Sequence, residues 1–189
     1  MQNLNQILKF IQKAEELKSL MRHSWLSTGR RESVAEHSWR VALLAIVLAP
    51  EMDYKINIGK VVMMLTIHDI AEIEAGDHHA WRPKLQNKTK LERTGLKKLV
   101  KSLPKKQQEE ILSLWEEYEA KKTPEAKFAK AVDKLETIDQ HNLADIKTWN
   151  KREKTYNLIH GTEEVKYSKT LQSLKDLIDN QSRAKIAKK

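Results

Sequence analysis

The sequence predicts an all-α fold, a single helical bundle, from three observations. Apolar residues recur at helical spacing along most of the chain, and capping residues and prolines stand where such segments begin or end. No alternating strand pattern, internal repeat or linker interrupts them. The length of 189 residues is enough for one domain with a substantial core. We therefore expect one domain over residues 1–180, followed by a basic, frayed tail at 181–189.

The first half of the chain is expected to form three helices. Residues 2–21 carry apolar side chains at helical spacing, and the polar residues 22–33 are expected to form a loop. Ser33 is suited to cap the second helix, with Glu36 completing a capping box, and this helix should end at the next proline. Asn57 can cap the third helix, which is the most apolar of the chain.

The second half is expected to begin with a loop and to continue as four helices. Thr123 is suited to cap the longest of them, and the proline that follows suits its first turn. The expected helix over 89–103 contains Gly95, which weakens it. The expected segments are the loop 77–87 and the helices over 89–103, after Pro104, over 124–149 and over 162–180.

The composition narrows the kinds of site and compartment that suit this chain. It contains no cysteine, which excludes disulfides and thiolate zinc sites and favours a reducing compartment. Any metal must then be bound by His, Asp or Glu, which suits Zn, Mn, Co, Ni, Fe or Mg. The N-terminus lacks the pattern of a signal peptide, and the apolar run 41–49 is too short to span a membrane. We expect a cytoplasmic protein without a membrane segment.

The net charge of +9 is compatible with nucleic-acid binding and also with attraction of small phosphate anions. Much of the excess lies at residues 84–106 and 184–189. Few aromatic residues interleave with these lysines, whereas single-stranded nucleic acids are bound by basic grooves with stacking aromatics. A solvated basic surface is therefore favoured over a nucleic-acid interface.

The most apolar predicted helix carries an unusual number of ionisable side chains. His68, Asp69 and Glu72 follow a crowded apolar run, and burying such groups is costly unless they have a partner or a metal. On a continuous helix, His68 and Glu72 would lie on overlapping faces because they are four residues apart. Gly76 suits the end of the helix and would leave Asp77 at the rim of a pocket. We therefore expect a metal site on this helix.

Two residues elsewhere complete a candidate ligand set. His37 follows the capping turn of the second helix, and Asp133 stands among apolar residues of the longest helix. Together with His68 and Asp69 they offer two neutral nitrogens and two anionic oxygens. Such a set nearly neutralises a divalent ion and leaves coordination positions open for water and substrate.

The order of these residues, H…HD…D on separate helices, resembles the HD-domain metal-dependent phosphohydrolases. The segments SVAEHSWRVA, HDIAEIEAGD and AVDKLE are similar to the corresponding segments of the HD-domain 5'-deoxynucleotidases. Arg22 and Trp25 resemble the Arg and Trp that this subfamily places ahead of its first metal histidine. The resemblance covers roughly residues 4–150 and places the metal-site core at about 22–150.

This resemblance implies a function and a set of roles. The function is metal-dependent removal of the 5'-phosphate from deoxyribonucleoside monophosphates by a homodimer, with one divalent metal ion per site. Physical chemistry is consistent with each role, because a metal activates water, a carboxylate takes its proton and a guanidinium binds phosphate. The implied metal ligands are His37, His68, Asp69 and Asp133; Asp69 and Glu72 are catalytic; Arg22 binds the phosphate, Trp25 the sugar and Asp77 the 3'-hydroxyl.

Several alternatives are left open by the sequence. An HD-domain hydrolase could act on another nucleotide, such as a cyclic dinucleotide or a guanosine polyphosphate. The chain could instead be a basic nucleic-acid-binding helical module with an inactive site, or hold a purely structural metal. Asp133 could be the ion-pair partner of Lys130 or Lys134, and Asp77 could merely terminate a helix.

Overall fold

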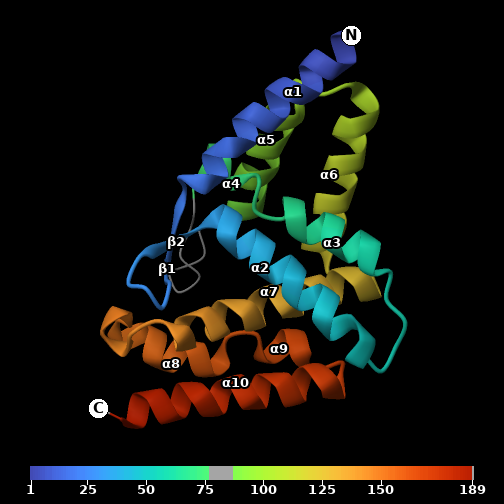
Figure 1. The fold of residues 1–189 in the computed structure, drawn as a ribbon. Helices are drawn as coiled ribbons and strands as arrows, with labels where there is room; N and C mark the ends of the chain where they lie inside the picture. Colours follow the sequence, from blue (N-terminus) through green and yellow to red (C-terminus); the bar gives the residue numbers. More distant parts are fainter. Residues whose placement is uncertain (77–86, 189) are drawn as a thin grey trace.

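The computed structural model describes residues 1–76 and 87–188 and confirms the all-α prediction (Figure 1). Short 3-10 segments follow α1, α2 and α7 at Glu15–Lys18, Ala49–Glu51 and Ile146–Thr148. One small hairpin pairs β1 (Met21–Trp25) with β2 (Arg31–Ser33). The helices are α1 (Gln2–Ala14), α2 (Val34–Leu48), α3 (Ile58–Ile67), α4 (Glu72–Ala75), α5 (Lys88–Val100), α6 (Lys105–Ala120), α7 (Pro124–Leu143), α8 (Lys151–Ile159), α9 (Thr162–Val165) and α10 (Lys169–Ala187).

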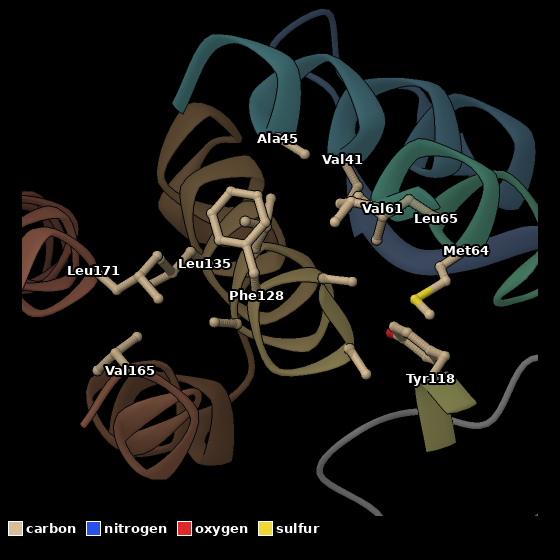
Figure 2. Close-up of a cluster of buried hydrophobic side chains, with 14 of the residues drawn as sticks. Val41, Ala45, Val61, Met64, Leu65, Tyr118, Phe128, Leu135, Val165 and Leu171 are labelled. Carbon is tan, nitrogen blue, oxygen red and sulfur yellow. The ribbon is translucent and has the colours of Figure 1, made fainter. Parts of the chain in front are cut away.

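The central element is α7, which lies between α2 and α3 on one side and α9 and α10 on the other (Figure 1). Thr123 caps it through a hydrogen bond from a backbone N–H, and Pro124 occupies its first turn, as expected. Its fully buried Phe128 and Leu135 belong to the main apolar cluster (Figure 2). Polar residues on its face toward α2, such as Asp133, are therefore enclosed by protein.

A second apolar cluster joins α1 with α5 and α6. Trp115 of α6 is buried in this cluster and donates its indole N–H to the backbone oxygen of His68 at 3.2 Å. The cluster thereby supports the turn that follows α3. Its buried members are Phe10, Leu17, Val34, Ile70, Ala71, Leu96, Leu99, Val100, Leu103 and Trp115.

The segment 22–33 belongs to a small hairpin and is not the predicted loop. Met21 pairs with Ser33 and Trp25 with Arg31, in an irregular antiparallel register. The Arg31 side chain donates to the backbone oxygen of Arg22 at 2.9 Å. The strands are short and polar, and contacts with neighbouring elements stabilise them. They therefore lack the alternating apolar pattern from which strands are predicted.

The helices differ from the predictions at four further places. The first helix gives way to a 3-10 turn after Ala14, and α7 ends at Leu143 instead of near Trp149. The separate helix α8 was not predicted, although Asn150 and Glu153 form a capping box at its start. At the C-terminus, α10 continues through Ala187, and Lys185 Nζ donates to a backbone oxygen of α7 at 2.6 Å.

The predicted third helix is interrupted where its ionisable residues begin. α3 ends at Ile67, a turn covers residues 68–71, and α4 starts at Glu72. The argument that His68 and Glu72 share a face of one helix was therefore wrong. Gly76 ends α4 with φ of 77°, as its position suggested. The predicted Asp77 lies outside the described residues.

Gly95 is buried where α5 approaches α4. A Cβ at this position would lie 3.0 Å from Glu74 Cβ and 3.3 Å from Ala71 O. We expect Gly95→Val to lower the free energy of unfolding by about 1–3 kcal/mol, because the added methyl groups overpack this contact. Urea denaturation, monitored by circular dichroism, measures this change in the free energy of unfolding. Gly59→Val, on the exposed first turn of α3, is the matched control and should change stability by less than about 1 kcal/mol. Equal effects of the two variants would contradict the packing role.

Candidate metal centre

The four predicted metal-ligating side chains converge in the structure, from α2, the turn after α3, and α7. Asp133 Oδ1 lies 3.2 Å from His37 Nε2 and 3.9 Å from His68 Nε2. Asp69 Oδ2 lies 3.0 Å from His68 Nε2 and 3.8 Å from His37 Nε2. Three of the residues are buried, and the Asp69 side chain is 23% exposed. The cluster is thus enclosed on most sides and reachable at Asp69.

Both imidazoles present Nε2 to the cluster because their Nδ1 atoms are engaged elsewhere. His68 Nδ1 donates to the backbone oxygen of Leu65 at 2.7 Å, which fixes its proton on Nδ1. His37 Nδ1 donates to Glu136 Oε2 at 2.6 Å. The buried His68 Nε2 has no hydrogen-bond partner among the described residues. Histidines that bind metals show this arrangement, with one nitrogen on the metal and the other donating to an oxygen.

The separations between the imidazole nitrogens and the carboxylate oxygens fit a single divalent ion, and His37, His68 and Asp69 have ligand atoms that all lie within 4.8 Å of one another. Bonds of about 2.0–2.2 Å to one ion place neighbouring ligand atoms roughly 3 Å apart and opposite ones at most about 4.4 Å apart. The four distances from imidazole nitrogen to carboxylate oxygen run from 3.0 to 3.9 Å. Two neutral nitrogens and two carboxylates also supply the charge and ligand types that such an ion requires. The residues present therefore fit the metal that the sequence led us to expect.

A second group of three side chains, Glu32, His37 and Glu136, also brings potential ligand atoms close together. Here the contact between His37 Nδ1 and Glu136 Oε2, at 2.6 Å, is too short for two ligands of one ion. Arg22 Nη1 lies 3.5 Å from Glu32 Oε2, so a cation is already present. This group is an ion-pair and hydrogen-bond network beside the metal centre.

The second oxygen of Asp133, which does not face the histidines in these contacts, is held by two donors. Tyr118 Oη donates to Asp133 Oδ2 at 2.9 Å, and Lys134 Nζ lies 2.9 Å from the same atom. Burial raises the pKa of Asp133, but Lys134 and the two histidines lower it well below its usual range. The alternative partner Lys134 therefore pairs with Oδ2, while Oδ1 faces the two histidines and stays in place for the proposed ligand role.

Metal binding to this cluster should depend on pH through His37. Burial and Arg22 lower the pKa of His37, but the carboxylates of Glu136 and Asp133 raise it to about 9. Below that pH the metal-free protein holds a proton that an ion must displace, so affinity should rise with pH and level off above about 9. We expect a gain of up to roughly tenfold per pH unit.

Calorimetric titration of the metal-stripped protein with Zn²⁺ at pH 6, 7 and 8 measures this dependence. Repeating the pH 7 titration in buffers of different ionisation enthalpy counts the protons released. An affinity that does not change over this range, with no proton released, would show that His37 is not titrated by the metal.

The predicted phosphate ligand, Arg22, lies half-buried beside the cluster on β1. Its Nη2 donates to Thr137 Oγ1 at 3.2 Å, and Nη1 makes no hydrogen bond with the described residues. Burial lowers the pKa of Arg22, but Glu32, Glu136 and the metal-centre carboxylates raise it above its usual value. Arg22 is therefore a fixed cation next to the ligand atoms, and its Nη1, which lies 3.5 Å from Glu32 Oε2, makes an ion pair there but no hydrogen bond within the described part of the chain.

For the other predicted site residues, Trp25 and Glu72, fewer contacts with the candidate metal centre are seen. Trp25 ends β1 and is partly exposed, and its backbone oxygen accepts a hydrogen bond from Gln140 Nε2 at 2.7 Å. Glu72 begins α4, is 5% exposed, and donates its backbone N–H to Asp69 O at 2.9 Å. Burial lowers the pKa of Lys88, but carboxylates including those of Glu92, Glu72 and Asp69 raise it. Glu72 thus lies in the same region as the metal centre.

Two residues of the site, Glu136 and Tyr118, were missed by the sequence reasoning, and both contact predicted ligands directly. Lys134 was named as an alternative partner of Asp133, and that ion pair is formed. Glu136 stands three residues after Asp133 on α7, so the helical period offered a signal that both point the same way. Tyr118 lies on α6, and no local pattern connects it with the site.

The family follows from a comparison of the whole chain with known proteins. The family described as HD domain matches residues 14–175. The chain belongs to the HD-domain family. Among curated proteins, this HD domain is 34% identical to human 5'-deoxynucleotidase HDDC2 over 137 residues, which is 71% of the chain and 66% of the human protein. It is also 34% identical to Schizosaccharomyces pombe 5'-deoxynucleotidase hdd1 over 142 residues, 71% of the chain and 70% of that protein.

The resemblance to the HD-domain 5'-deoxynucleotidases is thereby confirmed, although the chain spans slightly less than two thirds of the human relative. Among solved structures, the HD domain matches a "predicted metal-dependent phosphohydrolase" from Magnetospirillum magnetotacticum. The TM-score is 0.81 with 32% identity, and the match covers 97% of this chain and 94% of the other. In the described part of this HD domain, every helix is too short or too polar to cross a membrane.

Proposed function

We propose that this HD domain is a metal-dependent phosphomonoesterase that removes the 5'-phosphate from deoxyribonucleoside 5'-monophosphates. The observation that carries the proposal is the convergence of two histidines and two aspartates on one centre beside the half-buried cation Arg22. A phosphate ester needs positive charge on both sides of its phosphorus, and a divalent ion and a guanidinium supply it. The names of the human and S. pombe relatives support the same reaction.

The proposed metal ligands are His37, His68, Asp69 and Asp133, and the ion could be Zn, Mn, Co, Ni, Fe or Mg. When bound, a divalent ion supplies Lewis-acid stabilisation of negative charge and lowers the pKa of water. Asp69 combines the ligand role with partial exposure, so the ion would be approached from its side.

The remaining roles belong to side chains around this centre. Arg22 would direct its Nη1, which pairs with Glu32 but makes no hydrogen bond with the described residues, to a phosphate oxygen. Glu72, placed next to Asp69 by a backbone hydrogen bond, would take a proton from the attacking water. Trp25 would pack against the sugar and exclude a 2'-hydroxyl, and Asp77 would accept a hydrogen bond from the 3'-hydroxyl.

The experiment that tests the function measures phosphate release from deoxy- and ribonucleoside 5'-monophosphates. Metal-stripped protein is resupplied separately with Co²⁺, Mn²⁺, Zn²⁺ or Mg²⁺. We expect release that requires metal and favours deoxy substrates, with the preference reduced in Trp25→Ala. Equal turnover of both sugars would contradict the 5'-deoxynucleotidase assignment. Hydrolysis of a cyclic dinucleotide or guanosine polyphosphate alone would establish a different HD-domain substrate.

We also propose that this HD domain forms a homodimer and is located in the cytoplasm. The outer face of α2 exposes Trp39, Leu43, Ile46 and Val47, with exposed fractions of 43–66%. A contiguous apolar stripe of this kind is typical of a protein–protein interface, and a second copy would cover both stripes at once. The absence of cysteine from the sequence suits a reducing compartment.

A further inference from the structure

Glu136 of α7 is a buried carboxylate that contacts the candidate metal centre without belonging to its ligand set. It is 1% exposed. Its Oε2 accepts the hydrogen bond from His37 Nδ1 at 2.6 Å, and its Oε1 accepts one from Arg40 Nη1 at 2.8 Å. Each oxygen therefore serves a different partner. The carboxylate connects a proposed ligand on α2 with a cation one turn further along the same helix.

An ionised carboxylate at the buried position of Glu136 is costly, so the hydrogen bonds and cations around it must stabilise its charge. An ionised carboxylate that loses its hydration is stabilised only by good hydrogen bonds and nearby cations. Burial raises the pKa of Glu136, but His37, Arg22 and Arg40 lower it below its usual value. Arg40 is held in turn by Asp139 and by Gln140, whose Oε1 accepts from Arg40 Nη1 at 3.0 Å.

One face of α7 collects these contacts. Asp133, Glu136, Thr137 and Gln140 follow one another at helical spacing, and all four are buried. Asp133 faces His37 Nε2, while Glu136 accepts from Nδ1 of the same ring. The imidazole is therefore held at both nitrogens by side chains one turn apart on a single rigid helix. This arrangement fixes the rotation of the ring and the direction of its Nε2 lone pair.

We propose that Glu136 is a positioning residue that holds His37 for metal binding, and that Arg40 keeps Glu136 in place. The proposal rests on the metal centre of the proposed function, but not on which phosphate ester is the substrate. Without this carboxylate, His37 can rotate away from the ion, and its Nδ1–H loses its acceptor inside the protein. Oxygen acceptors behind metal-binding histidines typically contribute 10- to 100-fold to metal affinity or activity.

The test measures metal affinity, independently of catalysis, in the protein of residues 1–189 after its metal has been removed. We expect Co²⁺ to bind Glu136→Ala roughly 10- to 100-fold more weakly than the unaltered protein, and its visible spectrum to change. Glu136→Gln keeps an oxygen for His37 Nδ1, so it should recover part of the affinity. Arg40→Met should weaken binding in the same direction. Asp179→Asn is the control. It removes the charge of another buried carboxylate, which pairs with Lys175 on α10, and the variant should bind Co²⁺ normally.

A second measurement follows the hydrogen bond itself in metal-free protein. The proton between His37 Nδ1 and Glu136 should give a far-downfield NMR resonance that disappears in both His37→Gln and Glu136→Ala. Unchanged Co²⁺ affinity and spectrum in a folded Glu136→Ala protein would overturn the proposal; if that variant does not fold, unchanged binding by Arg40→Met would do the same. Weaker Co²⁺ binding by these variants, in a protein that releases no phosphate from nucleotides, would leave the positioning role standing and reject only the proposed substrate.

Discussion

Replacing Asp69 with alanine is expected to abolish metal-dependent phosphate release. Asp69 Oδ2 lies 3.0 Å from His68 Nε2 and 3.8 Å from His37 Nε2, so its removal takes away a ligand and one of two balancing negative charges. Residues behind the ligands contribute 10- to 100-fold, and a direct ligand should contribute more, so we expect a loss of at least about 10³-fold. The side chain is partly exposed, so the fold should tolerate its removal.

Metal content and phosphate release, measured on the same preparation of Asp69→Ala, check this prediction. Bound metal should fall together with activity, while circular dichroism stays unchanged. Asp176→Ala, on the exposed face of α10, is the matched control and should keep both properties. A folded Asp69→Ala protein that binds one ion and retains its activity would remove Asp69 from the ligand set and require another centre.

Replacing Glu72 with glutamine is expected to lower kcat by about 10²- to 10⁴-fold, the range for loss of a general acid or base. The amide keeps the size and most hydrogen-bonding capacity of the side chain but cannot accept a proton. Glu72 is buried at the start of α4 and is bonded through its backbone to Asp69, so it lies beside the proposed ligands without being one. The affinity for metal should therefore change little.

Steady-state kinetics and metal titration together separate the two roles. Glu74→Gln is the matched control, because Glu74 lies on the same short helix but pairs with Lys98 of α5. It should leave kcat unchanged. If Glu72→Gln instead lost its metal while a metal-saturated sample kept normal kcat, Glu72 would be a ligand or a support of one, and the proton acceptor would have to be another group.

Local sequence determined the main helices and the four residues proposed to bind metal. The capping box of Ser33 and Glu36 is formed as expected, and Thr123 caps α7, because side-chain caps act over three or four neighbouring residues. The cost of burying ionisable groups among apolar neighbours singled out His68 and Asp133, and both are buried at one centre. Such signals are readable from sequence because their physical causes are local.

Contacts between distant segments decided what the sequence did not reveal. The hairpin of β1 and β2 depends on partners such as Gln140, 115 positions from Trp25, and its polar strands carry no pattern of their own. The structure has a turn at residues 68–71 where a continuous helix was predicted. Trp115 of α6 supports this turn through a hydrogen bond to the backbone oxygen of His68. Glu136 acquired its partner His37 only when α2 packed on α7, because two residues far apart in sequence meet only through the fold.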